Sequence, residues 1–179
     1  MSMEFFAYPW MNLFFGEDEM KYKLSHMNGA LTFIPYGVAV DEFQAFVYEN
    51  PDITPAERRA EWRRIEQKYL PHIKYGSNKF LNEGGRWMRQ AHIFGSPFYY
   101  IDYTIAQVCA FQFFNAMQVD RKDAWDRYHS LCKLGGTKTF LDLLKDKNVK
   151  LVSPFKQGCI KKVVKPLKEF LNTIDDSKL

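Results

Sequence analysis

The residues most able to do chemistry lie in one short stretch, Gln90 to Gln107 (QAHIFGSPFYYIDYTIAQ). It holds one imidazole and three phenols: His92, Tyr99, Tyr100 and Tyr103. Neutral imidazole and phenol groups can donate hydrogen bonds, and such donors stabilise an oxyanion that develops in a transition state. A tyrosine-rich helix is also common in protein cores, where each hydroxyl finds a local acceptor. The residue types alone leave both interpretations open.

A turn and a helix start must position these side chains. Proline suits the first turn of a helix, because its missing N–H has no partner there. The sequence therefore predicts Ser96 as N-cap, Pro97 as the first helical residue, and a helix to about Met117.

The predicted helix places the tyrosines on one face. Tyr103 follows Tyr99 by four residues and Tyr100 by three, and side chains at these separations are neighbours on a helix. His92 would lie on the loop that leads into the helix. One imidazole and two phenols can then converge on one point.

Composition describes an ordinary globular chain. The 179 residues are 46% hydrophobic and 26% charged, which suits one folded domain over residues 1–179. A net charge of +4 is too mild to indicate nucleic acid. The basic runs at 58–64 and 161–168 have helical spacing typical of solvated faces. No apolar run is long enough to span a membrane. We expect a cytoplasmic protein with neither nucleic acid nor membrane as partner.

The sequence contains none of the common metal or nucleophile motifs. It has four scattered histidines without HExxH, and three widely spaced cysteines without CxxC. Neither a zinc site nor a disulfide framework is therefore indicated. GxSxG, GxGxxG and P-loop motifs are also missing.

Helical spacing and helix stop signals predict an all-α fold, since no segment alternates over strand length. The expected helices besides the tyrosine helix are residues 17–25, a kinked or broken helix over 28–49, Thr54-capped 55–70, Asp120-capped to 134, Thr137-capped to 147, and 154–174 opened by Ser153-Pro154. Gly84-Gly85 could be a hinge, a ligand contact or a plain turn. Asp41 and Glu42 lie in apolar context, and we expect at least one on the wet face.

The first fifteen residues, MSMEFFAYPWMNLFF, are apolar and have no N-cap before them. A helix normally begins with one. We expect either that Met1 lies inside a helix whose beginning is missing, or that the segment packs against an absent partner. An ordinary aromatic core segment is the alternative.

Three stretches resemble the C-terminal part of the catalytic domain of M3-family zinc oligopeptidases of the oligoendopeptidase F type. They are MSMEFFAYPWMNLFF, FIPYGVAVDEFQAFVYENPDITPAERRAEW (33–62) and HIFGSPFYYIDYTIAQ (92–107). The similarity covers most of residues 1–117, and residues 138–179 resemble the closing helices more loosely. The resemblance implies a helical part of a zincin-like fold, zinc as the family's cofactor and short peptides as substrates.

The resemblance also implies roles. His92 matches the histidine that contacts substrate and helps stabilise the transition state, and Tyr103 matches the tyrosine that hydrogen-bonds the oxyanion. Tyr100 matches a second tyrosine, although the spacing around residues 95–97 leaves Tyr99 as the alternative. Glu4 matches a neighbour of the third zinc ligand rather than a ligand.

The chain departs from the family in one respect. The HExxH helix and the ligand glutamate would both precede Met1, and a catalytic zinc needs three protein ligands. We therefore expect no zinc on this chain alone and no hydrolysis without an N-terminal HExxH-bearing part. The alternatives are a truncated, non-catalytic module that binds peptides or oligomerises, and an inactive helical remnant. An uncovered apolar face over residues 1–15 predicts a homo-oligomer.

Overall fold

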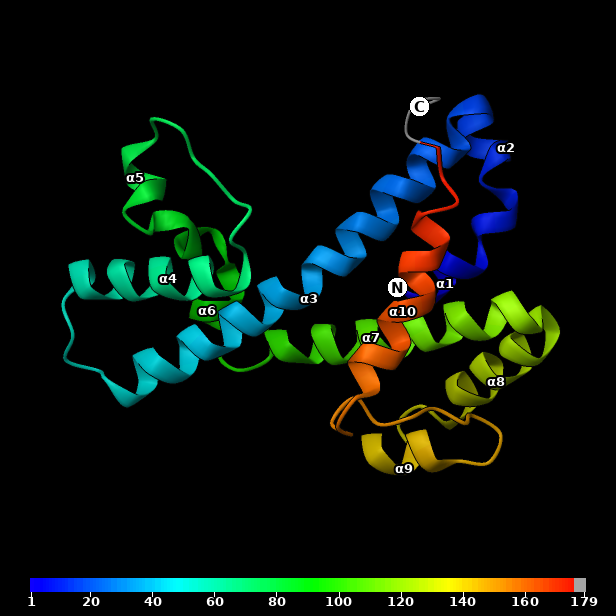
Figure 1. Cartoon of the computed structure of the whole chain (residues 1–179). Coiled ribbons are helices and arrows are strands. Elements are labelled where there is room, and N and C mark those ends of the chain that lie inside the picture. Colours follow the sequence, from blue (N-terminus) through cyan, green and yellow to red (C-terminus); the bar gives the residue numbers. More distant parts are fainter. Residues whose placement is uncertain (176–179) are drawn as a thin grey trace. The chain divides into compact units, whose positions relative to one another are not determined.

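Two long helices run through the fold. The computed structural model describes residues 1–175, with α3 at Glu19–Glu49 and α7 at Tyr100–Val119 (Figure 1). The chain divides into two compact units, Met1–Ala30 with Ile105–Leu179, and Leu31–Thr104, and each long helix contributes to both. The residues described contain no strand, so the all-α prediction is confirmed. The prediction of a single domain over residues 1–179 is not tested by this division.

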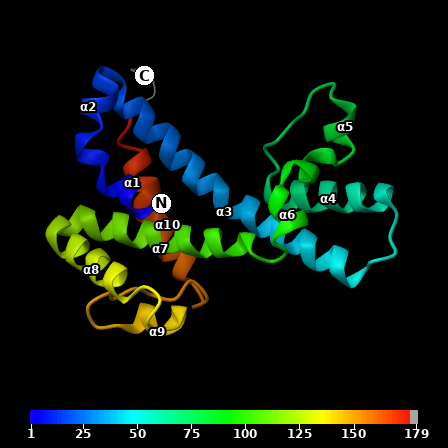
Figure 2. The same cartoon turned by 180° about the vertical axis from the view of Figure 1, so that it is seen from behind.

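The unit formed by residues 31–104, called here the tyrosine unit, is built on the second part of α3. Helix α4 returns along α3 in both views (Figures 1 and 2). The predicted capping box of α4 is present, since the Thr54 side chain accepts from Glu57 N and the Glu57 carboxylate accepts from Thr54 N. The other elements are α4 (Pro55–Tyr69), α5 (Lys79–Asn82), the 3₁₀ helix η3 (Gly85–Arg89), α6 (Ala91–Gly95) and the start of α7.

Aromatic rings form the core of the tyrosine unit. The Phe43 ring lies 5.3 Å from that of Trp62 and 5.1 Å from that of Trp87, centroid to centroid. Phe43 and Trp62 are fully buried. Trp62 and Ile65 of α4 are both fully buried and face this core.

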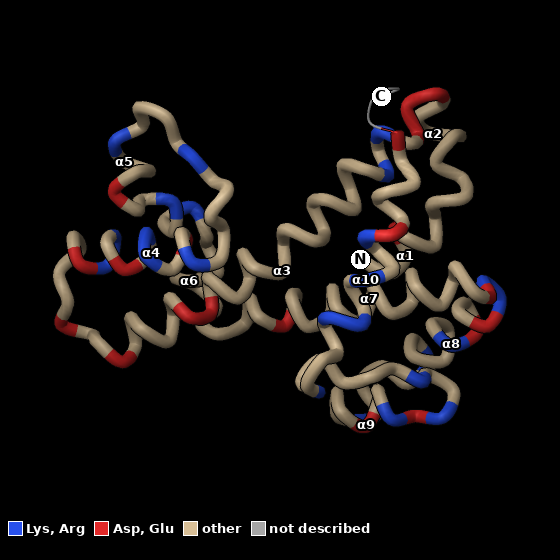
Figure 3. Tube along the Cα trace, viewed as in Figure 1, with Lys and Arg blue, Asp and Glu red and all other residues tan. Residues whose placement is uncertain are grey.

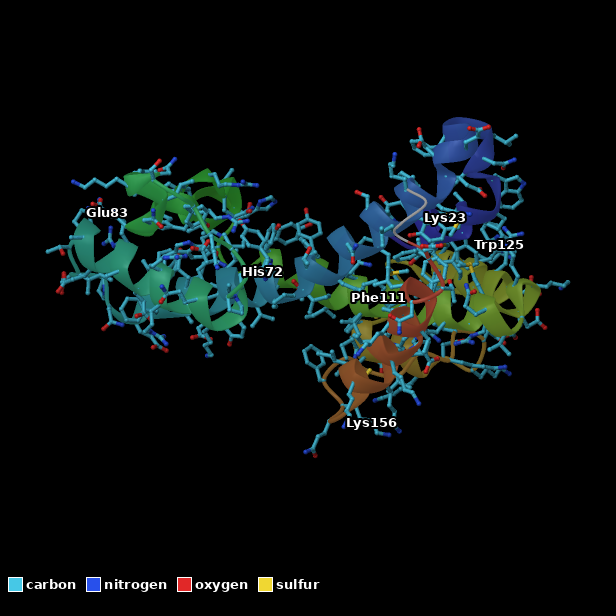
Figure 4. The ribbon with its side chains drawn as sticks, turned by 45° about the horizontal axis from the view of Figure 1, so that its top comes forward. Lys23, His72, Glu83, Phe111, Trp125 and Lys156 are labelled. Carbon is cyan, nitrogen blue, oxygen red and sulfur yellow. The ribbon has the colours of Figure 1, made fainter. Side chains whose placement is uncertain are left out.

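The second unit joins the first 30 residues to the segment after Thr104. Helix α8 returns along α7 (Figure 2), and Phe5 packs its ring against those of Phe111 and Phe114, at 5.7 and 5.3 Å between centroids. Figure 4 labels Phe111, which is fully buried. The elements of this unit besides parts of α3 and α7 are α1 (Ser2–Phe6), η1 (Tyr8–Trp10), α2 (Asn12–Phe15), η2 (Gly16–Asp18), α8 (Arg121–Leu134), α9 (Phe140–Lys145) and α10 (Cys159–Leu171).

Charges of both signs alternate along α4 (Figure 3). Arg64 pairs with Glu61 at 2.6 Å and Lys68 with Glu42 at 2.8 Å. Neighbouring acids thus neutralise part of the basic run at 58–64. Within residues 1–175, no helix is both long enough and apolar enough to cross a lipid bilayer.

The expected break in the first long helix is wrong. Residues 17–25 and 28–49 were expected as separate helices, whereas α3 is one helix that contains both Pro35 and Gly37. Proline removes one backbone hydrogen bond, but the tyrosine unit packs around this part of α3. The space at Gly37 is taken by α7, since a Cβ there would lie 1.8 Å from Oγ1 of Thr104.

Three predicted helix starts are displaced toward the C-terminus. Helix α7 begins at Tyr100 instead of Pro97, and Ser96 is the C-cap of α6 rather than an N-cap. Helix α9 begins after Thr139, because Thr137 donates its hydroxyl to Leu134 O at the end of α8. Helix α10 begins at Cys159 after Gly158, whose φ of 77° ends the preceding turns. The Asp120-capped helix α8 is confirmed.

We predict a coupling between Gly37 and Thr104. Gly37→Ala should lose stability through overpacking, by ~1–3 kcal/mol, partly offset by ~1 kcal/mol of helix propensity. Thr104→Ala removes the contacted hydroxyl, which has no hydrogen-bond partner in the described structure. The double variant should therefore lose less stability than the sum of the losses in the two single variants.

Urea unfolding of the four proteins measures this coupling. Gly29→Ala, also on α3, is the control, since a methyl there meets no atom within 4 Å, and it should be neutral or stabilising. Strict additivity of the Gly37 and Thr104 effects would contradict the close packing.

Candidate functional site

The imidazole of His92 lies among three tyrosine rings of the tyrosine unit. Its ring centroid is 6.3 Å from that of Tyr99, 5.1 Å from Tyr100 and 5.8 Å from Tyr103. The Tyr103 ring is 5.2 Å from Tyr99 and 5.7 Å from Tyr100. The structure thus brings together all four residues that the sequence singled out. Their catalytic roles stay a prediction.

The turn between α6 and α7 sets the relative placement of these groups. His92 lies on helix α6, so its expected place on a loop is wrong. Phe98 has a φ of 60°, a left-handed conformation that is uncommon for a residue with a side chain. Its backbone N–H donates to Oε1 of Gln44 at 3.0 Å, and Gln44 is only 1% exposed. This buried amide on α3 holds the turn that leads into α7.

The two candidate second tyrosines have different surroundings. Tyr100 is half-buried, with its ring 5.7 Å from Phe33 and 5.9 Å from Tyr36. Burial, and next the nearby Tyr36, raise the pKa of Tyr100 to about 12. Tyr99 is 46% exposed, and a hydrogen bond with it raises the pKa of Tyr103. Both neighbours of Tyr103 are thus close enough to assist it.

Two residues at the site were missed by sequence reasoning. The hydroxyl of Tyr36 donates to Oε1 of Gln90 at 2.9 Å, and Nε2 of Gln90 lies 2.6 Å from Nδ1 of His92. The only signal in the sequence was the closeness of Gln90 to His92. Tyr36 is far along the chain, and nothing local indicates that it reaches this amide.

A buried ionic cluster lies behind the site. Glu66 is fully buried and pairs with Arg63 at 2.7 Å and Arg86 at 3.2 Å, and it accepts a hydrogen bond from Tyr75. The Arg86 guanidinium also lies 5.3 Å above the Tyr36 ring centroid. A buried carboxylate needs such partners. One of them, Arg86, contacts Tyr36, whose hydroxyl binds Gln90.

The two carboxylates predicted in apolar context differ. Glu42 is partly exposed and binds Lys68 and Tyr69, and these hydrogen bonds lower the pKa of its carboxyl. Burial, and then the nearby Asp102, raise the pKa of Asp41. One of the pair is therefore on the wet face, as expected.

The groups that the structure places around His92 do not fit a catalytic zinc ion. His92 is surrounded by phenols and an amide, which are hydrogen-bonding groups rather than the usual zinc ligands. His72 lies exposed on the loop after α4 (Figure 4), and the other two histidines belong to the second unit. Over residues 1–175, no three His, Cys, Asp or Glu side chains are grouped to hold a metal.

Comparisons with known proteins identify relatives among solved structures. No family model matches the sequence, and no curated protein matches it. A protein assigned as an oligoendopeptidase F is 55% identical with a TM-score of 0.95, over 99% of this chain and 31% of that one. PZ peptidase A, solved with an inhibitor, is 54% identical with a TM-score of 0.93, over 98% and 31%. A protein assigned as an oligoendopeptidase F from Bacillus anthracis is 48% identical with a TM-score of 0.82, over 99% and 28%.

The helical fold and these matches, at 48–55% identity over almost the whole chain, define the class of protein. The chain belongs to the oligoendopeptidase F family, and it spans about 30% of the length of these relatives. The resemblance carried by the three sequence stretches is thereby confirmed.

We predict that Tyr100 makes stability fall at high pH. Its pKa is about 12 in the folded chain against an ordinary value of 10.0, so unfolded chains lose this proton first as pH rises. Stability is fully present below pH 10 and declines from there toward pH 12. Tyr100→Phe should flatten this decline.

Urea unfolding at pH 9, 10 and 11 tests the prediction. Tyr48→Phe, which removes a hydroxyl from an exposed ring, controls for the loss of one phenol. An unchanged pH slope in Tyr100→Phe would show that this hydroxyl is not responsible.

Proposed function

We propose that this chain supplies the substrate-binding and transition-state-stabilising wall of a zinc metalloendopeptidase that hydrolyses short peptides. The observation that carries the proposal is the convergence of His92 and Tyr103, with ring centroids 5.8 Å apart. Membership of the oligoendopeptidase F family supports the peptidase reaction. The proposal includes four further statements. The metal is zinc, the substrates are short peptides, the chain is the C-terminal part of the peptidase, and the protein is cytoplasmic.

The proposed chemistry uses hydrogen-bond donors only. Attack on a peptide carbonyl moves negative charge onto its oxygen, and fixed donors stabilise that charge most when they need not reorganise. A phenol whose pKa is raised keeps its proton near neutral pH, as proposed for Tyr103. In this proposal Tyr103 donates a hydrogen bond to the oxyanion, and His92 donates one to a carbonyl oxygen of the substrate. Tyr99 or Tyr100 is the second tyrosine of the site.

The remaining groups of the reaction would come from outside this sequence. A peptidase needs an activated water and a base, and none of the four residues is suited to supply both. The sequence has no HExxH. In this proposal the chain is inactive alone and turns over peptides only beside an HExxH-bearing part.

A second candidate is a module that binds peptides or oligomerises without catalysis. It is favoured by the apolar side chains of α2, where Leu13 is 73% and Phe14 74% exposed. Apolar groups left in water favour association when they form a contiguous face.

We predict that Tyr103→Phe lowers turnover about a hundredfold or more in a reconstituted enzyme, because one oxyanion donor is lost. Reconstitution would pair this chain with the part of the 55% identical relative that this chain does not match. Substrate affinity should be preserved, since the bond is made in the transition state.

Zinc content and peptide hydrolysis are measured for each part and for the pair, with Tyr22→Phe in the second unit as control. Peptide affinity without turnover in the pair would favour the non-catalytic module. Hydrolysis by this chain alone, or full turnover by Tyr103→Phe, would contradict the proposed roles.

For the isolated chain we predict self-association through α2. Its mass by light scattering should exceed the 21.2 kDa of one chain as concentration rises. Replacing Leu13 and Phe14 by Glu should restore the single-chain mass, whereas Val119→Glu at a 90% exposed position should not. A single-chain mass at all concentrations would count against this face as an interface.

A further inference from the structure

Gln90 connects two aromatic groups from different helices. Its Oε1 accepts the Tyr36 hydroxyl of α3 at 2.9 Å, and its Nε2 lies 2.6 Å from Nδ1 of His92 on α6. One end of a primary amide accepts hydrogen bonds and the other only donates them. The orientation of this amide therefore decides whether Nδ1 of His92 carries a proton.

The Tyr36 hydroxyl selects the amide orientation. Tyr36 is partly buried, and Gln90 Oε1 is the acceptor that the structure gives its proton. Burial, more than the opposing arginines, sets the pKa of Tyr36 and raises it, so the phenol keeps that proton at neutral pH. A reversed amide would direct its N–H donors at Tyr36 and leave the phenol proton without this acceptor, and an unpaired buried donor is costly.

The amide orientation in turn selects the imidazole tautomer. With Oε1 engaged by Tyr36, the Gln90 amide presents N–H to Nδ1 of His92, which must then be an unprotonated acceptor. A neutral imidazole has one proton, so it is on Nε2. We propose that Gln90 is a positioning residue that, held by Tyr36, fixes His92 as the Nε2–H tautomer.

The Nε2–H tautomer is the one that the proposed function can use. Nδ1 is occupied by Gln90, so Nε2 is the ring nitrogen left to meet a ligand. A proton there makes His92 a donor to a carbonyl oxygen or an oxyanion, whereas a lone pair would repel either. This use of the proton rests on the proposed function, while the tautomer itself does not.

Nitrogen-15 NMR of the imidazoles in the full chain tests the proposal without any substrate. Long-range proton–nitrogen correlation at pH 8.5, where an ordinary imidazole is neutral, identifies the protonated ring nitrogen. His92→Asn assigns the signals. We expect Nε2–H for His92 in the wild type.

Three variants follow the proton. Gln90→Glu places an acceptor-only carboxylate at Nδ1 and should draw the proton there, changing the tautomer ratio tenfold or more for a charge-assisted bond of ~1.5–3 kcal/mol. Tyr36→Phe frees the amide to turn and should give a mixture of tautomers. Gln67→Glu makes the same atom change at an exposed position of α4 and should leave His92 unchanged.

Each outcome decides the proposal. An Nδ1–H imidazole in the wild type overturns it, even where a variant fails to fold. A proton that stays on Nε2 alone in folded Gln90→Glu also overturns it, and an unmixed tautomer in folded Tyr36→Phe removes Tyr36 from it. Absence of peptide turnover in the reconstituted enzyme, together with Nε2–H in the wild type, refutes the proposed function and leaves the positioning role standing.

Discussion

The contact between Gly37 and Thr104 is the constraint on which the site depends. A missing side chain on α3 lets α7 approach until even one methyl group would overlap the Thr104 hydroxyl at 1.8 Å. Thr104 directly follows Tyr103, and Tyr36 directly precedes Gly37. This close contact between the two helices therefore lies next to one phenol from each helix. Close-packed protein interiors transmit small displacements. The contact between Gly37 and Thr104 therefore helps to fix the positions of the site residues.

The electrostatics of the site follow from the same packing. Burial is the first cause of the raised pKa values of Tyr36 and Tyr100, and a hydrogen bond with Tyr99 is the first cause for Tyr103. Phenols in these surroundings keep their protons near neutral pH. Two nearby charged groups, Glu66 and Arg86, pair with each other. Arg89 acts on Tyr36 and Tyr100 only by lowering pKa values that burial raises more strongly.

The features predicted correctly from the sequence are those that depend on residues close together in the chain. The capping box at Thr54 and the Asp120 cap were readable because each involves residues three positions apart. Pro35 was misread because its local penalty is outweighed by packing that the sequence does not display. The start of α7 was misplaced because Phe98 adopts its left-handed turn with help from Gln44, a residue on another helix. His92 and the tyrosines were found from their spacing, whereas Gln90 and Tyr36 meet only in the fold.

The part that this chain plays in the proposed reaction follows from its functional groups, which are hydrogen-bond donors. Hydrogen-bond donors stabilise charge that another group has generated, but they cannot generate a nucleophile themselves. A wall of donors is thus useful only opposite a part that activates water. The positioning of His92 by Gln90 fits this role, because the amide engages the nitrogen that would otherwise act as a base and leaves the other nitrogen as a donor. A site designed for base catalysis would instead place an acceptor at Nδ1, as a carboxylate does.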